Sequence, residues 1–214
     1  MNMLFTRLSG AALLLVALPL HAITISLNPA TQTVTAGSSL DVALVISGLG
    51  DGAAPSLGTF DVNVSFDQSI LSFSTVAFGP FLGDPSLLES INSFDDTSTP
   101  GIVNLYALSL LEGDSTTCIF CIPPYLDDLQ PASFTLATLT FSALSVGTSP
   151  LGITLNALGD ANGGTLTADL VGGSVNVNAD NNPGSVPEPA AWLLLGLGAL
   201  IMCRYTRRPS GIKI

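Results

Sequence analysis

Apolar and polar residues alternate along much of the chain. The clearest run is LGTFDVNVSFDQ, in which every second residue from 60 to 66 is apolar and the residues between them are polar. Strict alternation puts the two kinds of side chain on opposite faces of a β-strand. The run therefore predicts a half-buried strand on which Thr59, Asp61 and Asn63 face outward.

The same signal recurs in segments separated by clusters of Gly, Pro, Asn and Asp. These segments are residues 23–27, 40–47, 71–78, 102–110, 134–144, 151–158 and 173–177. No convincing amphipathic helix lies between them. Eight or nine strands in about 160 residues predict an all-β domain over residues 23–180, a nine-stranded jelly-roll β-sandwich.

The N-terminal end has the layout of a secretory signal peptide. Arg7 precedes an apolar stretch over residues 10–18, and Pro19 and the small Ala22 follow it. This order of charge, short apolar run and small-residue exit is typical of an exported protein, although a buried N-terminal helix is the alternative. We expect residues 1–22 to be removed on export.

The C-terminal end combines a Pro-Glu-Pro motif, an uncharged apolar stretch over residues 190–203 and a cluster of arginines. As a helix, the apolar stretch would span roughly 21 Å, which is short of the roughly 30 Å hydrocarbon core of a bilayer. The arginines are the flank expected on the inner side of a membrane segment. The stretch is therefore a marginal anchor.

In the order of these three parts, the tail resembles the PEP-CTERM sorting signal. The residues that carry the resemblance are Val186, Pro187, Glu188, Pro189, Arg204, Arg207 and Arg208. The resemblance implies processing by an exosortase, a membrane cysteine peptidase, and a place at the cell surface or in the extracellular matrix of a bacterium that makes exopolysaccharide. We expect a linker at 181–186 and a sorting signal at 187–214 that contacts the inner membrane transiently. A permanent single-pass anchor is the alternative.

All five cationic side chains lie in the two ends, and the single histidine, His21, precedes the predicted cleavage edge. Fifteen of the 16 acidic residues lie in the body, since only Glu188 lies beyond it. A surface without cations cannot neutralise phosphates, which argues against a nucleic-acid partner. We expect a neutral or cationic partner, with calcium as a possible bridge whose place the sequence does not reveal.

The missing residue types also exclude most catalytic machinery. Without His, Lys or Arg, the body cannot form a Ser-His-Asp triad, a Schiff-base lysine or an imidazole zinc site. The carboxylate pairs Asp95–Asp96 and Asp127–Asp128 could act as acid and base on a glycosidic bond. Both pairs lie in segments that the composition predicts to be loops, where solvated turn residues are common. We therefore predict no enzyme, no catalytic residue, no cofactor and no metal ligand.

Most of the body also resembles a cohesin domain. The features are a Pro-x-x-x-x-Val-x-x-Gly opening at Pro29, the segment SFDQSIL, the strand TLTFSAL and the closing GGSVNV, in that order. Cohesins bind dockerins, small calcium-loaded modules, through one flat sheet face. Asp61 falls where many cohesins direct an aspartate toward the dockerin, and Thr59 where they often carry asparagine. An ordinary solvated strand is the alternative for both residues.

The chain has a single such module, with no repeat, dockerin or cellulose-binding segment. This departure from cellulosome scaffolds favours an adhesion module that binds a dockerin-like protein at the surface or in the matrix. The same sandwich serves carbohydrate-binding modules, so binding of a polysaccharide is an alternative, as is a purely structural matrix role. A carboxylate glycosidase ranks third.

A long connection, LLEGDSTTCIFCIPPYLDDLQPAS, separates two of the predicted strands. Long loops with aromatic residues often carry binding sites, so Phe120, Tyr125, Asp127 and Asp128 form a second candidate patch. The alternative is that these side chains fold back to cover one end of the sandwich.

The same loop contains Cys118 and Cys121. We expect the two to form a disulfide, because the compartment is oxidising and Cys203 leaves with the tail. A redox role would require a helix directly after the Cys-x-x-Cys motif, and Pro123 and Pro124 argue against one.

Overall fold

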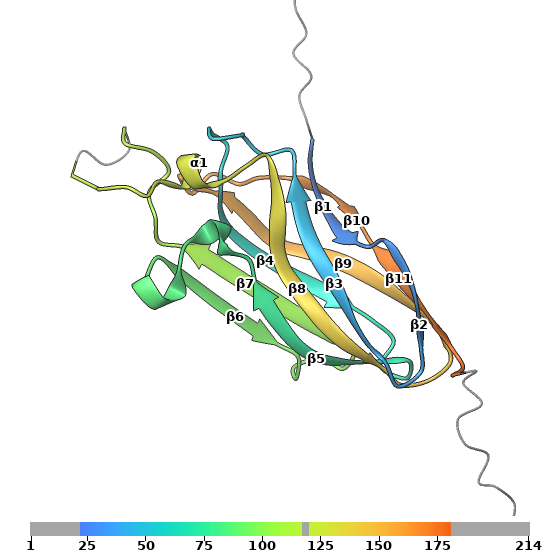
Figure 1. Cartoon of the computed structure of the whole chain (residues 1–214). Coiled ribbons are helices and arrows are strands. Elements are labelled where there is room, and N and C mark those ends of the chain that lie inside the picture. The colour runs from blue at the N-terminus through green and yellow to red at the C-terminus, as the bar shows by residue number, and fades with distance from the viewer. Residues whose placement is uncertain (1–21, 117–119, 181–214) are drawn as a thin grey trace, which may run out of the picture. The chain divides into compact units, whose positions relative to one another are not determined.

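Two β-sheets pack face to face as a sandwich (Figure 1). The computed structural model describes residues 22–116 and 120–180, and those up to Ala179 form one compact unit. One sheet has the strand order β10-β1-β3-β8-β5 and the other the order β2-β11-β9-β4-β7-β6. The elements are β1 (Ile23–Asn28), β2 (Thr31–Thr35), β3 (Ser39–Ser47), β4 (Leu57–Ser65), β5 (Leu71–Phe78), the 3-10 turns η1 (Pro80–Leu82) and η2 (Pro85–Leu87), β6 (Ser90–Asp95), β7 (Ile102–Ser109), α1 (Leu126–Leu129), β8 (Ser133–Ala143), β9 (Gly147–Asp160), β10 (Ala168–Val171) and β11 (Gly173–Asn178).

The predicted all-β sandwich is confirmed, and its strand count depends on two strands that change sheet. β1 and β2 are separated by two residues, and β10 and β11 by Gly172 alone, yet the members of each pair lie in different sheets. Counting each pair as one strand gives the predicted nine. The ninth is β6, which the alternation does not reveal, so the assignment of Asp95 to a loop is wrong. Asp127 and Asp128 also lie in an element, the single helical turn α1.

The segments β1–β2 and β10–β11 pass from one sheet to the other next to each other. β1 pairs with β10 and β2 pairs with β11, both in parallel, and the backbone N–H of Ser174 donates to the carbonyl of Ala30 at 2.8 Å. A Cβ atom on Gly173 would lie 2.5 Å from the same carbonyl oxygen. Glycine is therefore the residue that this crossing can accommodate.

Aromatic rings fill the space between the sheets on the side where β5 and β6 form the edges. Phe141 contacts Phe66 at a centroid distance of 5.2 Å and Phe73 at 5.9 Å, and Phe73 contacts Phe94 on β6 at 5.7 Å. All three pairs are edge-to-face, a geometry that adds about 0.5–1.5 kcal/mol per pair to the burial of the rings. These contacts link both sheets where no strand crosses between them.

Gln130 holds the beginning of β4 in place. Its side chain is 2% exposed; its Oε1 accepts from the N–H of Leu57 at 2.6 Å, and its Nε2 donates to the carbonyls of Leu57 at 2.8 Å and Phe81 at 2.9 Å. The amide thus takes the place of a neighbouring strand. It also ties the end of the long loop and the η1 turn to the central strand of the sheet.

The predicted signal peptide up to residue 21, the linker at 181–186 and the sorting signal at 187–214 lie outside the described residues. Within residues 22–116 and 120–180, no helix is long and apolar enough to cross a membrane.

We expect Gln130→Ala to lower the free energy of unfolding by about 2–4 kcal/mol, because it leaves buried backbone groups without partners. Gln68 is exposed, and Gln68→Ala should change the same quantity by less than about 0.5 kcal/mol. Chemical denaturation of the two variants measures the difference. Equal effects would show that the hydrogen bonds of Gln130 to Leu57 and Phe81 do not stabilise the fold.

Candidate functional site

The candidate site lies on β4, between β7 and β9 in the six-stranded sheet. Its inward side chains, such as Phe60 and Val62, are fully buried, and Thr59, Asp61 and Asn63 are half-buried on the opposite side. We call this side, formed by β6, β7, β4 and β9, the outer face. The predicted orientation of the three residues is confirmed.

Four side chains on the outer face form a closed ring of hydrogen bonds. Asn104 Nδ2 on β7 donates to Asp61 Oδ1 at 2.6 Å and to Asn63 Oδ1 at 2.9 Å. Asn156 Nδ2 on β9 donates to Asp61 Oδ1 at 2.9 Å, and Asn63 Nδ2 donates to Asn156 Oδ1 at 3.4 Å. We call Asp61, Asn63, Asn104 and Asn156 the amide ring. It joins three adjacent strands and orients the Asp61 carboxylate.

Strand register and one irregularity bring the ring together. Asn104 lies directly opposite Asn63 in the antiparallel pairing of β4 with β7. On the other side, Asp61 pairs with Ala157 while the next residue of β4 pairs with residue 155, so Asn156 is the extra residue of a β-bulge. A bulge re-aims a side chain relative to the regular strand. Here it accompanies an Asn156 side chain that reaches Asp61.

The amides of Asn104 and Asn156 were missed in the sequence analysis. Asn104 occupies an outward position of a predicted strand, so the alternation could have placed it on this sheet face, although not beside Asn63. For Asn156, the alternation with Leu155 could likewise have placed the side chain outward, but its position beside Asp61 depends on the bulge and carries no sequence signal.

Apolar side chains lie on the outer face next to the amide ring. Tyr106 lies opposite Asp61 in the register of β7 with β4. One step along, Leu108 lies opposite Thr59 and beside Ile91 of β6, which is 50% exposed. Thr59 Oγ1 itself donates to the backbone carbonyl of residue 107 at 2.9 Å. The face therefore offers apolar side chains next to an oriented carboxylate.

A pocket of about 270 Å³ adjoins the amide ring. It shares Asn63 and Asn104 with the ring, and its other lining residues are Asp95, Ser98, Thr99 and Ile102. Asp95 ends β6, and the turn after it donates several hydrogen bonds to its carboxylate. The hydroxyl of Ser98 and the N–H and hydroxyl of Thr97, the last two at 2.9 Å each, lower the pKa of Asp95 to about 2. The pocket thus keeps one ionised carboxylate in a fixed position.

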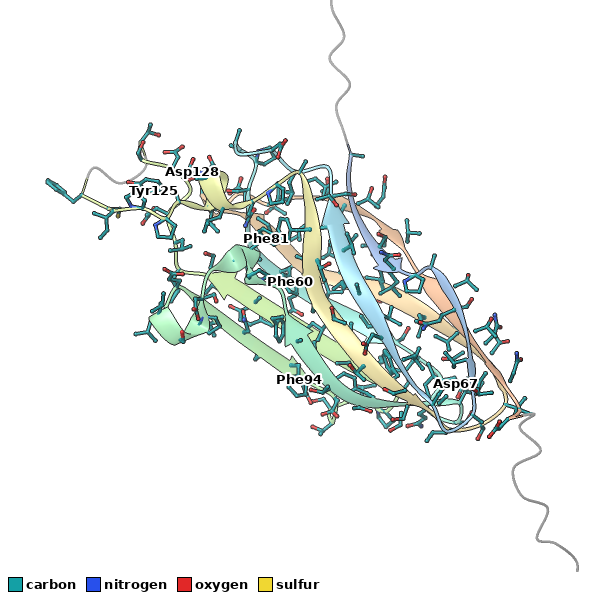
Figure 2. The ribbon with its side chains drawn as sticks, in the orientation of Figure 1. Phe60, Asp67, Phe81, Phe94, Tyr125 and Asp128 are labelled. Carbon is teal, nitrogen blue, oxygen red and sulfur yellow. The ribbon has the colours of Figure 1, made fainter. Side chains whose placement is uncertain are left out.

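The predicted loop patch is partly exposed. Phe120 is 95% exposed and Asp128 is exposed, whereas Asp127 is half-buried. Tyr125 is half-buried, and its hydroxyl donates to the carbonyl of Cys121 at 2.8 Å. Figure 2 places Tyr125 and Asp128 at the end of the sandwich opposite Asp67. The patch remains a prediction that is separate from the outer face.

Cys118 lies outside the described residues, so its predicted pairing with Cys121 stays a prediction. Among the described residues, no three acidic, cysteine or histidine side chains gather in a way that could hold a metal ion.

Comparison with known proteins identifies the tail and the fold. Residues 185–208 match the PEP-CTERM protein-sorting motif. Among solved structures, the chain is similar to a type I cohesin in a cohesin–dockerin complex from Clostridium thermocellum, with a TM-score of 0.57 and 15% identity over 73% of this chain and 99% of that chain. The chain is also similar to the sixth cohesin of scaffoldin B from Acetivibrio cellulolyticus, solved in complex with a dockerin, with a TM-score of 0.55 and 18% identity over 73% of this chain and 99% of that chain. A non-cellulosomal cohesin from the archaeon Archaeoglobus fulgidus is similar with a TM-score of 0.52 and 13% identity, over 75% of this chain and 94% of that chain.

At these identities the likeness shows the fold alone, and no curated protein matches the sequence. The chain thus combines a cohesin-like β-sandwich with a PEP-CTERM sorting motif. The motif marks an exported protein that is sorted by an exosortase.

The lowered pKa of Asp95 has a measurable consequence. Because the pKa in the folded state, about 2, lies below the ordinary value of 3.8, the carboxylate stabilises the fold above about pH 4 and loses this contribution as the pH falls through about 2. An NMR titration of the side-chain carboxyl carbon of Asp95 should therefore have its midpoint near 2. A midpoint near 3.8 would show that the turn does not hold the carboxylate.

Proposed function

We propose that the exported body is a non-catalytic binding module that recognises a protein partner through the outer face. The amide ring is the observation that carries this proposal. Three amide side chains from three strands surround one carboxylate, and two of them donate to it without a cation, which a merely solvated strand does not require. Holding polar groups in place before binding reduces the entropy lost on association.

The similar structures supply the chemistry of the proposed partner. Two of the similar cohesins were solved in complex with dockerins. We therefore infer a dockerin-like protein as the partner, with adhesion at the cell surface or in the matrix as the role. Calcium would act in such a pairing as part of the partner rather than of this chain.

The carboxylate pairs support a non-catalytic role. A general acid needs a raised pKa, and the turn after β6 lowers that of Asp95 to about 2. Asp127 and Asp128 are adjacent in the single turn α1. Adjacent residues of a helix do not face each other, so these two carboxyls are poorly placed to flank a glycosidic bond.

Binding can be tested with the immobilised body, residues 23–180, and the extracellular fraction of the producing organism. We expect capture of a protein partner, and Asp61→Ala should reduce the captured amount at least tenfold by removing the carboxylate at the centre of the ring. Asp41→Ala is the matched control, since Asp41 is exposed on β3 in the other sheet. Capture of polysaccharide alone would favour the carbohydrate-binding alternative, and capture of nothing would favour a structural matrix role.

Sorting is tested separately from binding. Deletion of residues 185–208 should abolish surface or matrix retention, because it removes the motif. Deletion of residues 209–214, which lie beyond the matched region, is the control and should leave localisation unchanged. Immunodetection in cell, matrix and medium fractions measures both. Unchanged localisation of the first variant would contradict exosortase routing.

A further inference from the structure

The outer face presents more free hydrogen-bond acceptors than donors to a binding partner. Within the amide ring, Asn104 donates both amide hydrogens to ring oxygens, and Asn63 and Asn156 donate one each. The hydroxyl of Thr59 donates to a backbone carbonyl of β7. In contrast, Asp61 Oδ2 and the side-chain oxygen of Asn104 accept no hydrogen bond from the described residues. The atoms left to meet a partner at the ring are thus mainly oxygens, and a partner must bring donors.

The charge of the body strengthens this requirement. Residues 22–180 contain 15 acidic side chains and no Lys, Arg or His. A second copy of the chain would bring the same negative charge to the face and no cationic side chain to offset it. Complementary charge therefore identifies the occupant as a basic protein surface rather than a second copy.

The pocket beside the ring has the form of a receptor for one long cationic side chain. Ile102 supplies an apolar wall against which an alkyl stem can pack, and Asp95 supplies an ionised carboxylate. Asn63 and Asn104 form the side that the pocket shares with the ring. An arginine suits this arrangement better than a lysine, because its planar guanidinium presents five donors to several acceptors at once.

We propose that the partner inserts an arginine side chain into this pocket, with its guanidinium between Asp95 and the amide ring, while its apolar residues cover Ile91 and Leu108. This proposal rests on the proposed function and names the partner chemistry of the same face. A guanidinium there donates to Asp61 Oδ2 and to the side-chain oxygen of Asn104, which the described residues leave open. Asp95 contributes its negative charge, since both of its oxygens already accept hydrogen bonds from its own turn. It also brings the positive charge that the body lacks.

The test uses Nα-acetyl-arginine amide as the probe and Nα-acetyl-citrulline amide as its neutral isostere. The body, which forms a compact unit, is titrated with each while the side-chain amide signals of Asn63 and Asn104 are followed by NMR. We expect saturable shifts with the arginine compound in the millimolar range, and affinity at least fivefold weaker for the citrulline compound. Asp61→Asn, which keeps the shape and removes the charge, should weaken arginine binding at least fivefold. Asp41→Asn, on the other sheet, should leave it unchanged.

The outcomes separate this proposal from the proposed function. Equal shifts with the two compounds, or shifts that Asp61→Asn does not alter, would overturn the arginine site even where a protein partner is captured. Shifts of the same signals with calcium chloride or a matrix oligosaccharide, but not with the arginine compound, would overturn it in favour of those ligands. If the arginine compound binds as expected and no protein partner is captured, the pocket chemistry stands and the proposed function fails.

Discussion

The burial of Phe60, Val62 and Val64 between the two sheets is the interaction on which the outer face depends. Turning these side chains inward turns Thr59, Asp61 and the residues that alternate with them outward. A slip of one residue would expose all three at a cost of about 5–9 kcal/mol, so the orientation of the strand is strongly fixed. The central place of β4 adds pairing on both edges. The ring is thus built on a strand that has little freedom to move.

Much of this fold follows from alternation alone, and the exception has a physical reason. In the first half of β6 the pattern is reversed, since Ser90 and Asn92 point toward the other sheet while Ile91 faces outward and is half exposed. Only Phe94, further along, follows the usual pattern by contacting Phe73 of the other sheet. Ser90 tolerates burial because its hydroxyl donates to the carbonyl of Gly83 at 2.9 Å. An edge strand that buries polar groups in this way gives no apolar signal. Its existence depends on contacts with distant residues.

The candidate site likewise has a part that the alternation predicts and a part that depends on distant residues. Asp61 and its outward orientation could be predicted, because they depend on a local period of two residues. The joining of Asn104 and Asn156 to Asp61 could not, because it depends on register between strands separated by some 40 and 90 residues and on a bulge in β9. The absence of cations from the body needed no structure at all. It nevertheless matters for the ring, since no cationic side chain of the body can pair with the Asp61 carboxylate.

The parallel pairing of the first strands with the last ones sets the order of events during folding. β1 and β2 are completed only by β10 and β11, so neither sheet can close until residue 178 is available. The apolar stretch of the tail begins 12 residues after that point. A chain made from its N-terminus therefore holds two incomplete sheets until nearly its whole body has been synthesised, and the sandwich closes only when the sorting motif is about to follow.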